Sequence, residues 1–182
     1  FVAATLPSLI GNQNSIAIKA QGQDVVAVRY KLDDQDWSAQ ALDVSSAFSV
    51  SALNDSEHTI QVLGIDAAGN EQSQNIASYT FTVDTIAPVV SLMSAPPAYT
   101  SSSQLTSSVS SFDAVYYEYK LDGGAWVKTP IADEFTLGNL SESAHTLYLR
   151  GIDAAGNVHP TPLAYEFTVD KSAPTAVLAE YP

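Results

Sequence analysis

The sequence predicts an all-β protein made of two tandem β-sandwiches with seven strands each. The chain repeats its own motifs once, at offsets of 86, 87 and 89 residues, and such a period suits a whole small domain. Apolar and polar residues alternate in short runs, which are separated by clusters of Gly, Asn, Asp, Ser and Pro. No window shows helical spacing over more than one or two turns. These observations favour short antiparallel strands over helices.

The repeat is defined by three motifs that occur in the same order in both halves. The pairs are 30–33 with 119–122, 64–70 with 151–157, and 81–88 with 167–174. The middle pair is identical, Gly-Ile-Asp-Ala-Ala-Gly-Asn in both copies. The repeat predicts one sandwich over residues 1–84 and a second over 89–170. Residues 85–88 form a short linker, which Pro88 stiffens by fixing its own φ. Residues 171–182 are a further linker or the start of a following repeat.

Strand positions follow from the alternation, because successive side chains of a strand point to opposite faces. Ile60 and Val62 alternate with polar neighbours in the first copy, and Leu147 and Leu149 alternate with Tyr148 and other polar residues in the second. The strands expected in the second copy cover 89–94, 103–110, 114–121, 125–129, 134–138, 145–152 and 163–169. The serine-rich tract 99–103 is interpreted as the loop between the first two of them.

Turn residues mark the connection between the third and fourth strands. Asp122-Gly123-Gly124 is typical of a tight hairpin turn in which glycine supplies the positive φ. The first copy has Asp33-Asp34-Gln35-Asp36 at that place, which predicts a looser and more acidic loop. Trp37 and Trp126 follow the turn. Their indole rings either close one end of the core or stack on a bound sugar.

The composition excludes several classes of partner. Seven Lys and Arg against twenty Asp and Glu give a net charge of −13, which repels nucleic acids and anionic membrane surfaces and favours cations. No apolar run approaches the roughly 18 residues of a membrane span. The absence of cysteine excludes disulfides and thiolate metal sites and is common in bacterial surface proteins. Because no signal peptide is visible at Phe1 and the chain stops abruptly at Pro182, we expect both ends to be cuts in a longer polypeptide.

The motifs resemble those of two related groups of domains. Residues 145–157 resemble the sixth strand and following turn of fibronectin type III domains. His58 and His145 occupy the corner before that strand, where these domains usually have a tyrosine tied back to the chain, so the tie here runs through an imidazole or is missing. The closer resemblance is to the bacterial immunoglobulin-like repeats of large surface adhesins and biofilm proteins. Those repeats share Tyr-x-Leu-Asp-Gly-Gly-x-Trp, Asp-Ala-Ala-Gly-Asn and Thr-Val-Asp-x-x-Ala-Pro, and only the Gly-Gly pair is confined to the second copy here.

The resemblance implies a non-catalytic spacer segment of a bacterial cell-surface or secreted repeat protein, such as an adhesin, biofilm or filament stalk. Its partners would be neighbouring immunoglobulin-like repeats of the same chain, outside the cell. One alternative is an accessory or carbohydrate-binding module of a secreted polysaccharide-degrading enzyme, and another is direct binding of a cell-surface or polysaccharide ligand. Further copies of the repeat would favour the spacer, and an adjoining catalytic domain would favour the accessory module. An exposed row of aromatic rings would favour sugar binding.

The predicted topology gathers oxygen ligands at the seam between the two sandwiches. The set consists of the acid that directly precedes the linker, one acid before the third strand and two residues of the loop before the last strand: Asp84, Asp113, Asp153 and Asn157. Calcium takes six to eight oxygen ligands, so this set is a candidate Ca²⁺ site that would lock the joint. The resemblance implies the same, because related adhesins hold calcium between domains.

An equivalent set, Asp24, Asp66 and Asn70, would face a preceding repeat. The alternative for both sets is that Asp-x-x-Gly-Asn forms only a turn, in which the aspartate caps backbone amides.

No motif indicates catalysis. His58, His145 and His159 fit structural roles, because two of them occupy equivalent corners. Asp133 and Glu134 match a glycosidase pair only in residue type, since neighbours in a strand point to opposite faces. The sequence has no Gly-x-Ser-x-Gly, no phosphate-binding glycine loop and no His-x-x-x-His pair. We therefore predict that the chain is not an enzyme.

Overall fold

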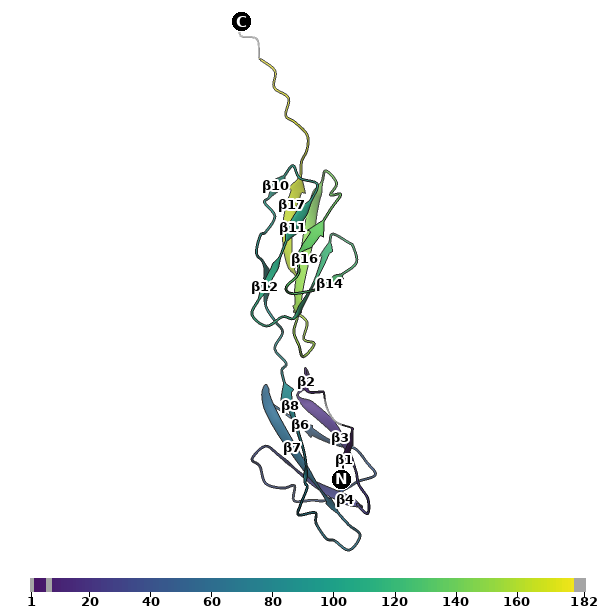
Figure 1. The fold of residues 1–182 in the computed structure, drawn as a ribbon. Coiled ribbons are helices and arrows are strands. Elements are labelled where there is room, and N and C mark those ends of the chain that lie inside the picture. Colours follow the sequence, from purple (N-terminus) through teal and green to yellow (C-terminus); the bar gives the residue numbers. More distant parts are fainter. Residues whose placement is uncertain (1, 6–7, 179–182) are drawn as a thin grey trace. The chain divides into compact units, whose positions relative to one another are not determined.

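The computed structural model describes residues 2–5 and 8–178, which form strands and turns and contain no helix (Figure 1). The all-β fold class is thus confirmed, and no helix capable of crossing a membrane occurs in this part of the chain. The chain divides into two compact units: residues 1–86 with 155–157, and residues 87–154 with 158–182. The tail predicted to start a following repeat, 171–182, lies outside the described residues from 179 onward.

The first unit contains a three-stranded and a five-stranded sheet. The smaller sheet has the order β1 (Val2–Thr5), β3 (Ser15–Gln21), β6 (Phe48–Ser51). The larger has the order β2 (Ile10–Gly11), β8 (Ala77–Val83), β7 (Ser56–Ile65), β4 (Ala27–Leu32), β5 (Leu42–Asp43). All pairs are antiparallel except β2, which runs parallel to β8.

The second unit repeats this architecture. Its five-stranded sheet has the order β10 (Tyr99–Thr100), β17 (Leu163–Val169), β16 (Ala144–Ile152), β13 (Tyr116–Leu121), β14 (Val127–Pro130). Two antiparallel pairs join β9 (Val90–Leu92) to β12 (Val109–Ser111) and β11 (Leu105–Ser107) to β15 (Phe135–Leu137). Each segment predicted as a strand contains one, but the second is interrupted at Ser108. The described residues therefore form nine strands here, β9 to β17, where seven were predicted.

The serine-rich tract is not wholly a loop, because its first two residues form β10. The amides of Thr168 and Asp170 donate to the carbonyls of Ala98 and Thr100, both at 2.9 Å. The last strand would otherwise leave these amides unpaired at the sheet edge, and two residues of parallel strand are enough to pair them. In the first unit β2 does the same for β8.

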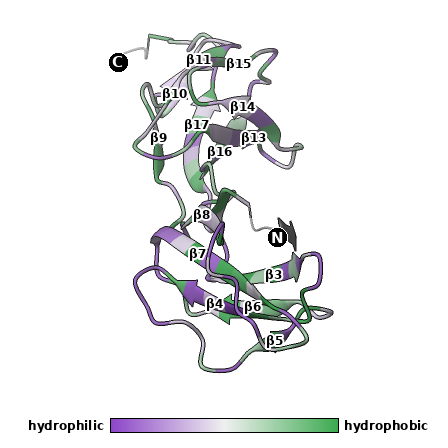
Figure 2. Ribbon diagram, turned by 60° about the horizontal axis from the view of Figure 1, so that its bottom comes forward, coloured by the Kyte–Doolittle hydropathy of each residue, from purple (hydrophilic) through white to green (hydrophobic). Residues whose placement is uncertain are grey.

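Each unit has its own apolar core, built from the alternation that the sequence shows. Ile60 and Val62 of β7 are buried in the first unit, and Leu147 and Leu149 of β16 are fully buried in the second. Hydrophobic and hydrophilic colours accordingly share single strands, as along β4 and β7 in Figure 2. Val26, which the same pattern would bury, precedes β4 and is about half exposed.

The hairpin turns correct two expectations, because aspartate and not glycine takes the left-handed conformation. Asp33 and Asp122 both have φ of 51°, whereas Gly123 and Gly124 are not among the residues with positive φ. In both units the carbonyl that precedes the aspartate accepts the amide three residues on, at 3.0 Å in the first and 2.9 Å in the second. The first copy therefore has the same tight turn as the second, without glycine.

The two tryptophans are half-buried and belong to neither core. The Lys31 Nζ lies 5.7 Å from the ring centroid of Trp37. The Arg150 guanidinium carbon and the Lys120 Nζ lie 4.3 and 5.0 Å from that of Trp126. The prediction that the indole rings close one end of the core is therefore wrong. Lysine and arginine alternate with buried residues along β4, β13 and β16, so the indoles pack on the face turned away from the core.

Glycine in the repeated Gly-Ile-Asp-Ala-Ala-Gly-Asn motif is required by close packing at its first position. A Cβ on Gly151 would lie 2.6 Å from Val90 Cγ1 and 3.3 Å from the Ala114 Cβ. We expect Gly151→Ala to lower the free energy of unfolding of the second unit by about 1–3 kcal/mol, the usual range for overpacking. Gly138→Ala, where the added methyl meets nothing within 4 Å, is the control. Equal urea midpoints for the two variants would contradict this expectation.

Candidate metal-binding loops and histidine corners

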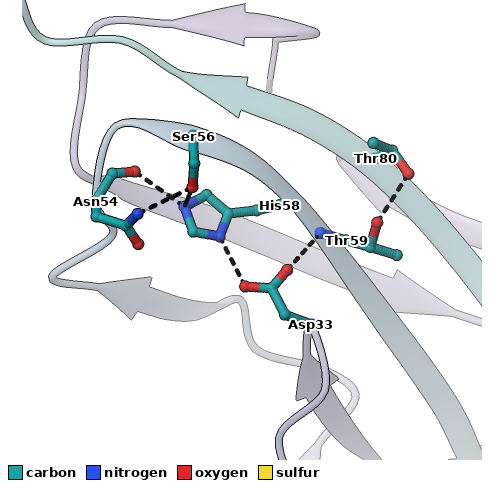
Figure 3. A network of polar contacts seen from close by, with 6 residues as sticks. All are labelled: Asp33, Asn54, Ser56, His58, Thr59 and Thr80. Atoms are coloured by element: carbon teal, nitrogen blue, oxygen red, sulfur yellow. Dashed lines mark hydrogen bonds and ion pairs between the residues drawn. The ribbon is translucent and has the colours of Figure 1, made fainter.

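A histidine ties the corner before β7 to the turn after β4 (Figure 3). The His58 Nδ1 lies 2.8 Å from Asp33 Oδ2, and the His58 Nε2 lies 3.0 Å from the Asn54 carbonyl oxygen. The other Asp33 oxygen accepts the Thr59 amide at 2.7 Å. Ser56 Oγ stands 3.3 Å from Nε2. The tie that sequence reasoning left open is therefore present, and it runs through the imidazole.

The second unit has a corner with the same hydrogen-bonding pattern. The His145 Nδ1 lies 2.9 Å from Asp122 Oδ2, and the His145 Nε2 lies 3.1 Å from the Ser141 carbonyl oxygen. Asp122 Oδ1 accepts the Thr146 amide at 2.7 Å. The ring packs on Phe167 with 5.5 Å between centroids. Both histidines are almost completely buried, although both aspartates are partly exposed.

The arrangement suits a charged imidazole. An ionised carboxylate and a carbonyl oxygen only accept hydrogen bonds, so both ring nitrogens must carry a proton to satisfy both partners. Sequence reasoning missed the aspartates in this role. Their signal was available, since Asp33 and Asp122 are retained in both copies while the glycines beside Asp122 are not.

The pKa values of both histidines are raised above 6.5. For His145 the hydrogen bond to Asp122 is the largest cause, opposed by burial and assisted by the Ser141 carbonyl and the Asp122 charge. For His58 burial acts first and lowers the pKa, but the Asp33 hydrogen bond, the Asn54 carbonyl and the Asp33 charge together outweigh it. The pKa of Asp122 changes in the opposite direction. Burial alone would raise it, but the hydrogen bonds from His145 and the Thr146 amide, together with the His145 charge, outweigh burial and bring the pKa below 3.8.

These shifts predict a stability that depends on pH. A histidine whose pKa is higher in the folded than in the unfolded state stabilises fully below about pH 6.5 and loses that contribution as pH rises through its folded pKa. We therefore expect the urea midpoint to fall between pH 6 and pH 9. The variant His58→Gln/His145→Gln should lose most of this slope. An undiminished slope in that variant would assign it to other groups.

A carboxylate of the same corner holds the segment that leaves each unit. Asp55 Oδ1 accepts the Thr85 amide at 3.0 Å and its hydroxyl at 2.9 Å, two residues beyond β8. In the second unit Glu142 Oε1 accepts the Lys171 amide at 3.3 Å and also the hydroxyl of Ser172. The first residues after the last strand are thus fixed to their own unit.

Two of the predicted calcium ligands lie close together in the second unit. Asp113 is in the loop between β12 and β13, where Ser111 Oγ accepts its amide at 3.1 Å, and Asp153 follows β16. Carboxylate oxygens of Asp113 and Asp153 lie within 4.8 Å of each other. Calcium–oxygen distances are about 2.3–2.6 Å, so one ion can bridge oxygens at this separation.

Asp84 and Asn157 complete the predicted set only by inference. Asp84 follows β8 in the first unit, and its Oδ1 accepts the Ile86 amide at 3.1 Å. Asn157 closes the loop that Asp153 opens, as Asn70 does after Asp66. Because Asp84 belongs to the other unit, its approach to Asp113 and Asp153 stays a prediction.

The equivalent loop of the first unit is organised as a turn. Asp66 Oδ1 accepts the amides of Ala68 and Asn70 at 2.9 and 2.8 Å, and Oδ2 accepts the Asn70 side-chain amide at 2.8 Å. These bonds from Asn70 are the main cause that lowers the pKa of Asp66. Asp24, Asp66 and Asn70 all line one surface depression, and their role as a calcium site stays a prediction. Asp66 is already occupied by the turn, which favours the alternative that the sequence left open for this loop.

Asp133 and Glu134 lie in the turn before β15 and not on a strand. The Asp133 carbonyl accepts the hydroxyl of the fully buried Tyr117 at 2.9 Å. The backbone of Asp133 therefore satisfies the hydroxyl of a core residue.

No protein-family model and no curated protein matches this chain. Solved structures do match. The chain is similar to the fibronectin(III)-like modules of CbhA from Clostridium thermocellum, with a TM-score of 0.52, 14% identity and coverage of 94% of both chains. It is also similar to a 1.5-MDa bacterial ice-binding adhesin (TM-score 0.41, 18% identity, 91% of this chain and 61% of that one). A Ca²⁺-stabilized, ice-binding adhesin of an Antarctic bacterium matches at 0.40 with 18% identity, over 89% of this chain and 46% of that one.

Of these three, the likeness to the clostridial modules has a TM-score above 0.5, and it assigns the fold. It extends over 94% of this chain. The chain has the fold of fibronectin type III-like modules.

Proposed function

We propose that this chain is a non-catalytic spacer segment of a bacterial cell-surface or secreted repeat protein, located outside the cell. In this proposal residues 1–84 and 89–170 are tandem sandwich domains with 85–88 as linker, and further repeats are their neighbours. The observation that carries it is the parallel pairing, in each unit, of the short second strand with the last strand, β2 with β8 and β10 with β17. Tension on the two ends of a unit would load these hydrogen bonds in shear, so several must break together. Such a device suits a segment that transmits force.

Mechanical unfolding tests this role. When the chain is stretched between handles on its two ends, two separate unfolding events are expected, one for each core. When the handles are attached instead at residues 32 and 121, inside the sheets, the unfolding force should be lower. A single event, or extension without any force peak, would contradict a spacer built from two load-bearing domains.

We further propose that calcium stiffens the joint, held by Asp84, Asp113, Asp153 and Asn157. The spacing of the Asp113 and Asp153 carboxylates supports this proposal, as does the net charge of −13, which a cation would partly relieve. The set Asp24, Asp66 and Asn70 would serve a preceding repeat only if calcium displaced the Asn70 bonds that now occupy Asp66.

Calcium at a hundredfold excess over its Kd should stabilise the chain by about 2.7 kcal/mol relative to chelator. The variant Asp113→Asn keeps the size of the side chain but removes its charge, and it should lose most of the response. Asp36→Asn, in an exposed turn of the first unit, is the matched control. An unchanged melting temperature together with no bound ion in native mass spectrometry would remove calcium from the proposal and leave the spacer untouched.

A carbohydrate-binding or accessory role is the second candidate, because the second unit exposes aromatic rings. Tyr99, Phe112 and Tyr116 are all exposed, Phe112 completely. They do not form one row. Tyr99 pairs with Thr168 of β17, which lies opposite Ala144 at the start of β16, whereas Tyr116 pairs with Ile152 at the end of β16, about 26 Å away along the strand. Retention on insoluble polysaccharide that Phe112→Ala/Tyr116→Ala abolishes would favour this role over the spacer.

A further inference from the structure

Each histidine corner is coupled to the exit segment through adjacent residues. His58 binds the carbonyl of Asn54, and the next residue, Asp55, binds Thr85. In the second unit His145 binds the carbonyl of Ser141, and the next residue, Glu142, binds Lys171. The carboxylate that holds the exit segment therefore extends from a stretch of backbone that the imidazole fixes. The same order of contacts in both copies makes a chance arrangement a poor explanation.

We propose that protonation of these histidines controls how firmly each unit holds the segment leaving its last strand. With both ring nitrogens protonated, Nδ1 donates to the aspartate and Nε2 to the corner carbonyl. After loss of the Nε2 proton, the nitrogen lone pair faces that carbonyl oxygen, and the corner loses its hydrogen bond. The hydroxyl of Ser56, 3.3 Å away, can then donate to Nε2 of His58 in its place.

The groups facing each ring restrict what can drive this change. Around His58 stand the Asp33 carboxylate from the turn after β4, the Phe81 ring of β8 and the polar groups of the corner itself. Around His145 stand Asp122, the ring of Phe167 and the hydroxyls of Ser141 and Ser143. Within the described residues, the charged side chain in contact with each ring is this aspartate.

The consequence is an exit segment that each unit holds more firmly in mildly acidic medium than in alkaline medium. Loss of about one net hydrogen bond, 0.5–1.5 kcal/mol, corresponds to roughly a twofold to tenfold change in local opening. The effect is confined to the corner and the exit segment, because the β7–β8 and β16–β17 ladders do not involve the imidazole.

Amide exchange of the intact chain tests the coupling. Protection factors of Thr85 and Lys171, corrected for the intrinsic pH dependence of exchange, should fall about twofold to tenfold between pH 6 and pH 8.5. In His58→Gln the Thr85 amide should be poorly protected at both pH values, while Lys171 in the same molecule keeps the wild-type response as an internal reference. His145→Gln should show the reverse.

The variant Asp55→Asn separates the titration of the imidazole from the hold on the exit segment. It weakens the hydrogen bonds to Thr85 but leaves the imidazole and its partners in place. The titration of His58 followed by NMR should then stay as in the wild type. If Thr85 protection in the wild type is equal at both pH values, or if His58→Gln retains the pH response at Thr85, the proposal is wrong. These readouts require no calcium and do not depend on the spacer role.

Discussion

Replacing Leu149 by alanine is expected to lower the free energy of unfolding of the second unit by about 2–5 kcal/mol, the usual cost of removing a fully buried leucine. Leu149 has no exposed surface and lies in the middle of β16, opposite Tyr119 on one side and Leu163 on the other. Because single domains have a net stability of only about 5–15 kcal/mol, much of the margin would be lost. Calorimetry should show a lower melting temperature for the transition of the second unit and an unchanged melting temperature for that of the first.

The unchanged transition is the informative part of that experiment. Each core is assembled from residues of one unit alone, so a cavity in the second should not be felt by the first. Val62 occupies the position of Leu149 in the first unit and is equally part of its core. Val62→Ala should therefore move the other transition, by less because fewer methylene groups are lost. If either variant shifts both transitions together, the two halves unfold as one body and the tandem assignment is wrong.

The fold class was predictable because two independent patterns agreed. The internal repeat set the size of the unit, and the alternation along β7 and β16 identified the buried face. What the patterns could not reveal is the short parallel strands β2 and β10. Two residues are too few to show alternation, and their position is decided by the free edge of the last strand.

Prediction of the candidate site was limited for a different reason. The Asp113–Asp153 pair could be anticipated, since strand order alone brings those two loops to one end of the sheet. The histidine corner could be located but not completed. Its partner Asp122 lies 23 residues away and was assigned to a glycine turn, because glycine is the usual residue at positive φ. A partly buried charge that also takes an unfavourable backbone conformation leaves no periodic signal, and only its retention in both copies pointed to it.

The replacement Asp122→Ala is expected to be the most damaging change outside the two cores. It removes the acceptor for both His145 Nδ1 and the Thr146 amide, and hydrogen bonds to charged groups are worth about 1.5–3 kcal/mol. Alanine must also adopt the φ of 51° that aspartate now tolerates, which costs about 1 kcal/mol more. Partial exposure of Asp122 reduces the first contribution, so a total of about 2–4 kcal/mol is expected from urea unfolding of the second unit.

Two matched variants separate these contributions. Asp122→Gly removes the same acceptors without backbone strain and should be less destabilising than Asp122→Ala by about 1 kcal/mol. Asp122→Asn tolerates the left-handed conformation and keeps an acceptor for Thr146, but it removes the negative charge that favours the imidazolium. Its unfolding free energy should therefore be close to that of the wild type at pH 9 and lower at pH 6. Equal losses at both pH values would show that Asp122 acts only as a turn residue, and that His145 is not held as a cation by its neighbour.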